Sequence, residues 1–166
     1  WILDRTQLLD KMAKCFCKLV GADGTGIVGM LSLEQASETA PTVISGEITG
    51  LTSGKHGFAV HVFGDLSNPP VSLGEHFNPY GKNHGSPDAD ERHTGSLGNI
   101  EANADGKAVV HIEDKLVKLI GPQSIIGRSL AVASGEDDLG AGGHEQSLIN
   151  GNAGPAVAFG VVGIKC

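Results

Sequence analysis

Residues 56–65 read HGFAVHVFGD, and small or apolar residues alternate with histidine there before the chain reaches Gly64 and Asp65. This alternation predicts a β-strand that sends side chains to opposite faces and then ends in a loop. Positions 59 and 61 share one face of that strand, so imidazoles at both could hold a single metal ion. Only His61 is present, because position 59 is Ala59.

The composition favours an all-β domain. Aromatic residues make up 4% of the chain and 25 residues are glycine, which is typical of many short strands joined by tight turns. The net charge of −7 disfavours nucleic acid and anionic membranes as partners. No apolar run approaches the roughly 20 residues that span a bilayer. The opening residues 1–7 are too charged for a signal peptide, so we expect a cytoplasmic protein.

The three cysteines are Cys15, Cys17 and Cys166, and this odd count argues against a complete disulfide framework. Cys15 and Cys17 form a C-x-C pair, which could bind copper(I) through soft thiolates. The alternative is that both face the interior of a strand as small apolar residues. We favour this second interpretation.

Alternation and turn residues predict eight strands. Their ranges are 13–20, 26–33, 42–49, 55–63, 95–102, 107–113, 129–133 and 156–164. They are broken by two long loops, residues 64–95 and 134–154. The pattern indicates an all-β fold, an eight-stranded Greek-key flattened barrel or sandwich with two long functional loops. The domain is expected to cover residues 12–166, with residues 1–11 as a disordered extension.

Histidines are concentrated around the first long loop. His61, His76, His84 and His93 fall within 33 residues, and a folded-back loop could bring them together. Imidazole is the commonest transition-metal ligand, and a loop with four prolines and no core of its own needs an anchor. The sequence therefore predicts a metal site. We expect His56, His111 and His144 to be structural or exposed.

Several motifs share the order and spacing of a known family. Besides residues 56–65, they are GEHFNP (74–79), HGSP (84–87), DERHTG (90–95), LGN (97–99), IGRSL (126–130), DDLG (137–140) and GNAG (151–154). From about Cys17 to Ile164 the chain resembles the copper/zinc superoxide dismutases. The resemblance implies a β-barrel in which four histidines hold copper and one of them bridges to zinc.

The resemblance implies that the copper site is incomplete. It assigns copper ligands to His61 and to the bridging His76, and the other two ligand positions hold Ala59 and Ala133. Since a methyl group cannot coordinate a metal, copper is doubtful as a cofactor.

By the same resemblance zinc is expected at His76, His84 and His93. Ser96 stands where the family has a zinc carboxylate, which leaves water as the fourth ligand. Three histidines and water also occur in hydrolytic zinc sites, so hydrolysis is an alternative. Asp137 matches the aspartate that links the two metal sites, and here we expect it to orient His84.

Other family features are also missing. The arginine that guides superoxide corresponds to Ala156, and a lysine of the second loop corresponds to Ile149. The positions of the family disulfide hold Pro70 and Phe159, so the loop lacks a cross-link that typically contributes about 2–4 kcal/mol.

The sequence therefore predicts a dismutase-like protein that retains zinc and has little or no superoxide dismutation. One alternative is a weakly active dismutase. Another is a partner of a genuine dismutase or of the related copper chaperone. A homodimer or heterodimer is expected through residues that resemble the family's dimer contact, although ordinary core packing would also explain them: Phe63, Gly64, Val161, Gly163 and Ile164.

Overall fold

Eight strands form a closed barrel in the computed structural model, which describes residues 12–166. The predicted extension, residues 1–11, lies outside the described residues. The strands are β1 (Ala13–Gly21), β2 (Val28–Gln35), β3 (Thr42–Thr49), β4 (Gly54–His61), β5 (Ser96–Ala102), β6 (Ala108–Asp114), β7 (Ser129–Ala133) and β8 (Ala156–Ile164). Three short helical segments are η2 (Ala22–Gly24), η3 (Val71–Leu73) and α1 (Ser147–Asn150).

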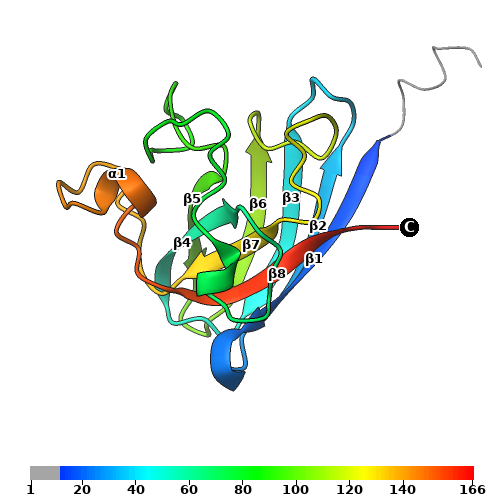
Figure 1. Cartoon of the computed structure of the whole chain (residues 1–166). Coiled ribbons are helices and arrows are strands. Elements are labelled where there is room, and N and C mark those ends of the chain that lie inside the picture. The colour runs from blue at the N-terminus through cyan, green and yellow to red at the C-terminus, as the bar shows by residue number, and fades with distance from the viewer. Residues whose placement is uncertain (1–11) are drawn as a thin grey trace, which may run out of the picture.

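The order of strands around the barrel is β1-β2-β3-β6-β5-β4-β7-β8, and β8 pairs with β1 to close it (Figure 1). Every pair of neighbouring strands is antiparallel. Strand β3 pairs with β6, and β4 pairs with β7. The chain therefore crosses over twice, from β3 to β4 and from β6 to β7, because these consecutive strands are not neighbours in the barrel. The predicted all-β, eight-stranded Greek-key barrel is confirmed.

Three strands have the predicted ends, and the other five differ by one or two residues. Strand β2 begins at Val28 rather than Gly26, because Gly26 has a positive φ and the Ile27 carbonyl accepts a hydrogen bond from Gly21 in a turn. Strand β4 ends at His61 rather than Phe63. The amide of Phe63 donates instead to Leu73, in the loop that follows.

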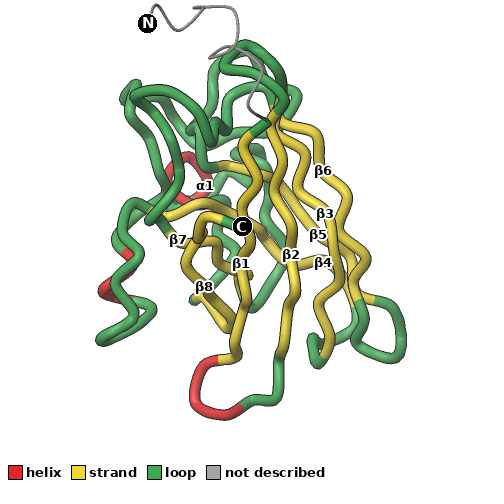
Figure 2. The backbone as a smooth tube through the Cα atoms, turned by 90° about the vertical axis from the view of Figure 1, so that its right-hand side faces the viewer, coloured by secondary structure: helices red, strands yellow, loops and turns green. Residues whose placement is uncertain are grey.

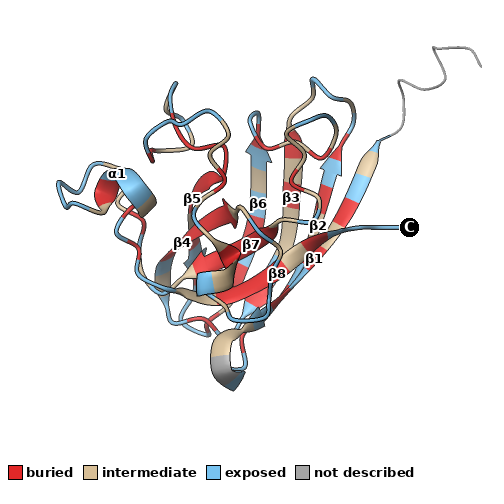
Figure 3. Ribbon diagram, in the orientation of Figure 1, coloured by how far each residue is buried: buried red, intermediate tan, exposed pale blue. Residues whose placement is uncertain are grey.

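The core lies inside the barrel, where inward side chains alternate with outward ones (Figure 3). Strand β2 shows the period: Leu31 and Leu33 are fully buried, whereas Met30 is exposed. Cys15 and Cys17 belong to this core, which confirms the apolar interpretation of the pair. Burial raises the pKa of Cys17 to about 12, so its thiol stays protonated.

The loops, green in Figure 2, gather mainly at one end and along one side of the barrel. Both predicted long loops are present. A third long connection, residues 115–128, was not predicted. It places Val117, Leu119 and Ile125 in the core, and the buried Gln35 side chain accepts hydrogen bonds from the Leu119 and Ile120 amides.

Within residues 12–166 the longest α-helix is a single turn, and none of the helices could cross a membrane.

Candidate metal centre

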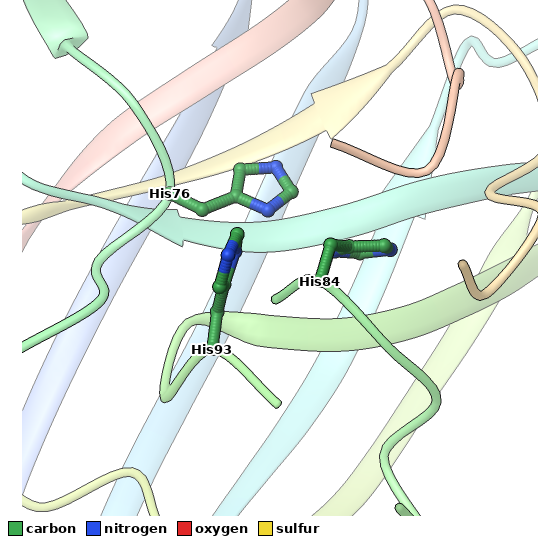
Figure 4. A group of neighbouring side chains, drawn as sticks. All are labelled: His76, His84 and His93. Atoms are coloured by element: carbon green, nitrogen blue, oxygen red, sulfur yellow. The ribbon is translucent and has the colours of Figure 1, made fainter. Parts of the chain in front are cut away.

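The histidines that the sequence singles out lie together. The side chains of His76, His84 and His93 are neighbours, and one ring nitrogen from each lies within 4.8 Å of the other two (Figure 4). His61, the last residue of β4, stands beside them with its ring centroid 5.1 Å from that of His76. One ion could bridge the group of three.

The other histidines lie elsewhere, in agreement with the prediction. His56 is buried, and its two ring nitrogens lie 2.8 and 2.9 Å from the carbonyl oxygens of Ala133 and Thr52. His111 and His144 are exposed.

Backbone pairing between β4 and the first loop positions His76. The amide of Val62 donates to Glu75, and that of Phe77 donates to Val60 at 2.8 Å. Phe77 also accepts a hydrogen bond from Gly95 through its carbonyl, so the loop folds back against the end of β4. This folding brings His76 beside His61, although 15 residues separate them in the sequence.

The buried Arg92 positions His93, a role that the sequence analysis missed. Its guanidinium donates to the carbonyls of His93 and Ser96, at 3.1 and 2.8 Å, and it pairs with the buried carboxylate of Asp114 on β6. The available signal was a cationic residue directly before a predicted ligand. The guanidinium thus holds the end of the loop against the start of β5.

Burial favours the neutral form of three of the imidazoles, those of His61, His76 and His93. It lowers the pKa of His61 and of His93, and it lowers the pKa of His76 furthest, with the neighbouring histidines adding to the effect. The Nδ1 atoms of His76 and His93 are buried without a hydrogen-bond partner. Unpaired buried nitrogens are costly, so their lone pairs fit a metal ion that would satisfy both.

His84 differs, because both of its ring nitrogens have partners. Its Nε2 donates to Asp137 Oδ1 at 2.7 Å, since a carboxylate can only accept. Its Nδ1 is therefore the acceptor, and the Ser96 hydroxyl donates to it at 2.7 Å. All three side chains are buried. Thus Ser96 already engages the lone pair that His84 would offer to a metal.

The second long loop closes over His84. The His84 amide donates to the Leu148 carbonyl in α1 at 2.8 Å. Directly after α1, Gly151 has a φ of 71°, and a Cβ there would lie 1.9 Å from Asp137 Oδ1. Only glycine lets the backbone approach the His84–Asp137 pair so closely.

A cavity of about 360 Å³ is lined by His61 and His76 but not by His84 or His93. These two residues provide its only imidazoles, and no lysine or arginine lines it among residues 12–166. Glu75 and Asp137 are its carboxylates. Several positions singled out from the sequence also line it, namely Pro70, Ala133, Ile149 and Ala156. Ala59 is buried on β4, where it pairs with Ser96 of β5 and with Ala131 of β7.

Phe159 is buried in a small apolar cluster with Leu73 and Ala131. Leu73 belongs to the first loop, three residues after Pro70, so an apolar contact attaches this loop where no disulfide is possible.

Core packing is the wrong explanation for two of the candidate interface residues. Phe63 is 57% exposed and Ile164 is 78% exposed. Gly64 lies against β8, because a Cβ on it would be 3.1 Å from Val161 Cγ1. Phe63 and Ile164 are therefore exposed apolar side chains, the first directly before Gly64 and the second at the end of β8.

Comparison with known proteins gives similarities over most of the chain. The family model described as copper/zinc superoxide dismutase (SODC) matches residues 27–162. A Cu-Zn superoxide dismutase of Talaromyces marneffei is 52% identical over 142 residues, covering 85% of this chain and 92% of that protein. The Candida glabrata Cu-Zn superoxide dismutase is 51% identical over 154 residues, covering 92% and 99% respectively. Superoxide dismutase [Cu-Zn] 5 of Dictyostelium discoideum is 48% identical over 142 residues, covering 86% and 93%.

Proposed function

This chain belongs to the copper/zinc superoxide dismutase family, and we propose that it is a zinc-holding member with little or no superoxide dismutation. The observation that carries the proposal is the number of donors in the cavity beside His61 and His76. Two imidazoles line it, and a side chain at Ala133 offers only a methyl group. A copper ion that changes oxidation state needs more nitrogen donors than these.

Zinc fits the other side of His76. We assign it to His76, His84 and His93, because the buried Nδ1 atoms of His76 and His93 have no hydrogen-bond partner. When bound, zinc would supply a positive charge that cross-links the loop segments. Asp137 holds the His84 ring with Nδ1 as the unprotonated atom. Ser96 takes the place of an anionic ligand and leaves the site less negative.

Copper does not fit its half of the site. Besides the missing imidazoles at Ala59 and Ala133, the cavity contains carboxylates and no cationic side chain among the described residues. An anion such as superoxide would meet repulsion from Glu75 and no attraction at Ala156 or Ile149.

Metal analysis combined with a superoxide-removal assay tests the proposal. We expect about one zinc and much less than one copper per chain, with superoxide removal near the uncatalysed rate. The double variant Ala59→His/Ala133→His should raise the copper content towards one per chain. Placing the same two histidines at the exposed Ala104 and Ala141 is the matched control and should leave the copper content unchanged. Stoichiometric copper with rapid removal by the unmodified chain would overturn the proposal.

A second candidate function is binding to another barrel of the family, either a second copy or a genuine dismutase. The exposure of Phe63 and Ile164 beside β8 favours it.

We also place the protein in the cytoplasm, because Cys15, Cys17 and Cys166 are free thiols and reducing compartments preserve these.

A further inference from the structure

The cavity beside His61 and His76 has the dimensions of a ligand site. Its volume of about 360 Å³ falls in the range of about 300–1,000 Å³ that is usual for small-molecule pockets. It is formed between the two long loops and strands β4, β7 and β8. Residues far apart in the sequence build it, and all belong to the described barrel and its loops.

Apolar side chains make up a large part of its walls. Pro70 and Val71 come from the first loop, Ala131 and Ala133 from β7, and Ala156 from the start of β8. At the mouth Val71 is 78% exposed and Ile149 is 50% exposed. Exposed apolar side chains around a concave site favour an apolar occupant, because its binding removes them from water.

Among the polar groups that line it, His61 and the two carboxylates accept hydrogen bonds, whereas Gln146 and Asn150 are neutral amides. The Nδ1 atom of His61 donates to the Gly74 carbonyl at 2.8 Å, so Nε2 of this neutral ring carries the lone pair. The Asp137 carboxylate already accepts from His84 and from the Leu139 amide. Glu75 adds a negative charge at the wall. An anion is therefore disfavoured, and a hydroxyl donor is favoured beside His61.

We propose that this cavity binds a small, uncharged, largely apolar molecule that carries a hydroxyl group, with phenols as the chemical class. The hydroxyl donates to Nε2 of His61 and the ring lies against the alanine and proline side chains. The site goes beyond the proposed function, since it requires neither zinc nor copper. The space beside His61, where the family resemblance implies copper, would then hold an organic molecule.

Three naphthalene probes test the chemistry of the site by calorimetric titration of the full chain. 2-Naphthol should bind with saturation. 2-Methoxynaphthalene lacks the donor and should bind about 3–10-fold more weakly, the effect of one lost hydrogen bond. 2-Naphthoate, which is an anion, should show no saturation. Equal binding of all three probes, or no binding of 2-naphthol, would refute the proposal.

Two substitutions locate the binding. Ala133→Phe and the milder Ala156→Leu fill the cavity and should each weaken 2-naphthol by at least tenfold, whereas Ala104→Phe in the exposed β5–β6 turn should not. Circular dichroism checks that each variant is folded. On the unmodified chain, methyl NMR shifts should move at Ala131, Ala133 and Ala156, and shifts confined to other residues would contradict the assignment. In His61→Leu, 2-naphthol should lose its advantage over 2-methoxynaphthalene.

Discussion

The Ser96 hydroxyl determines how His84 presents its ring. It donates to Nδ1 at 2.7 Å, while Asp137 accepts from Nε2 on the other side. This chain of hydrogen bonds orders the loop before any metal arrives, and binding of zinc at Nδ1 would have to break one of them. The neutral serine therefore weakens the proposed zinc site in two ways, by competing for a ligand and by supplying no charge.

Ser96→Asp should strengthen zinc binding, on the order of 10–100-fold, because a carboxylate adds an anionic oxygen at the same place. In the zinc-free protein the same change should lower the free energy of unfolding by about 1–3 kcal/mol, since the buried carboxylate then has no cation. Competition with a chromophoric chelator measures the affinity, and urea unfolding measures the stability. Ser96→Ala is the control: it frees Nδ1 and adds no ligand. Equal affinities for the aspartate and alanine variants would contradict the assignment.

Burial governs the chemistry of Cys15 and Cys17, since it raises the pKa of both thiols. At pH 8 we expect a thiol-specific disulfide reagent to modify one cysteine rapidly in the folded protein, the exposed Cys166, and all three after unfolding. In the unfolded chain Cys17 ionises near its usual pKa of 9.0, but in the fold only near 12. Its contribution to stability is therefore complete below pH 9 and is lost as the pH rises towards 12. Rapid modification of two or three thiols would revive the copper(I) interpretation.

At the scale of elements, local patterns predicted the strands well. Alternation and turn glycines located β3, β7 and β8 to the residue. The connection 115–128 was missed, because its core residues are held by partners far away in the sequence: the Leu119 amide donates to Gln35, and the Val117 carbonyl accepts from the Thr42 hydroxyl. The density of histidines predicted that the loop folds back. It could not predict Arg92 as the anchor, since its partner Asp114 lies 22 residues away on β6.

Arg92→Leu should destabilise the zinc-free protein by about 3–5 kcal/mol, because it leaves the buried Asp114 carboxylate without its cation. The loop that carries His93 would also lose its attachment to β5. Urea unfolding followed by circular dichroism measures the change. Lys82→Met is the matched control, since its pair with Glu91 is exposed and screened by water, so its loss should change the stability far less. A similar cost for both variants would mean that Arg92 is not the anchor.

On the scale of the whole molecule, the barrel and the loop over the cavity are held by different contacts. The barrel closes through β1 and β8 with a continuous core. The loop over the cavity is attached by apolar contacts, with Phe159 packed in one cluster with Leu73. Single residues such as Ala133 and Ala156 could be read from the sequence, but their meeting in one apolar cavity could not, because that depends on how two loops close over β7.

The surface beside β8 bears on the assembly of the whole molecule. Exposed apolar side chains at Phe63 and Ile164 favour a partner, and Gly64, next to Phe63, lies against Val161 of β8. We expect light scattering to give a dimer at micromolar concentration. Phe63→Lys/Ile164→Lys should halve the molar mass, because burying two charges in the contact is costly.

Met30→Lys/Val109→Lys is the matched control, since both residues are exposed on β2 and β6 and should leave the dimer intact. If the unmodified chain is a monomer, mixing it with a genuine dismutase and measuring native mass spectra distinguishes a heterodimer from no assembly. A monomer in both experiments, or a dimer that the first double variant leaves intact, would remove this surface as the site of assembly. Loss of the dimer in the first double variant alone would identify the surface beside β8 as the contact, because the control carries the same added charge on β2 and β6, which do not pair with β8.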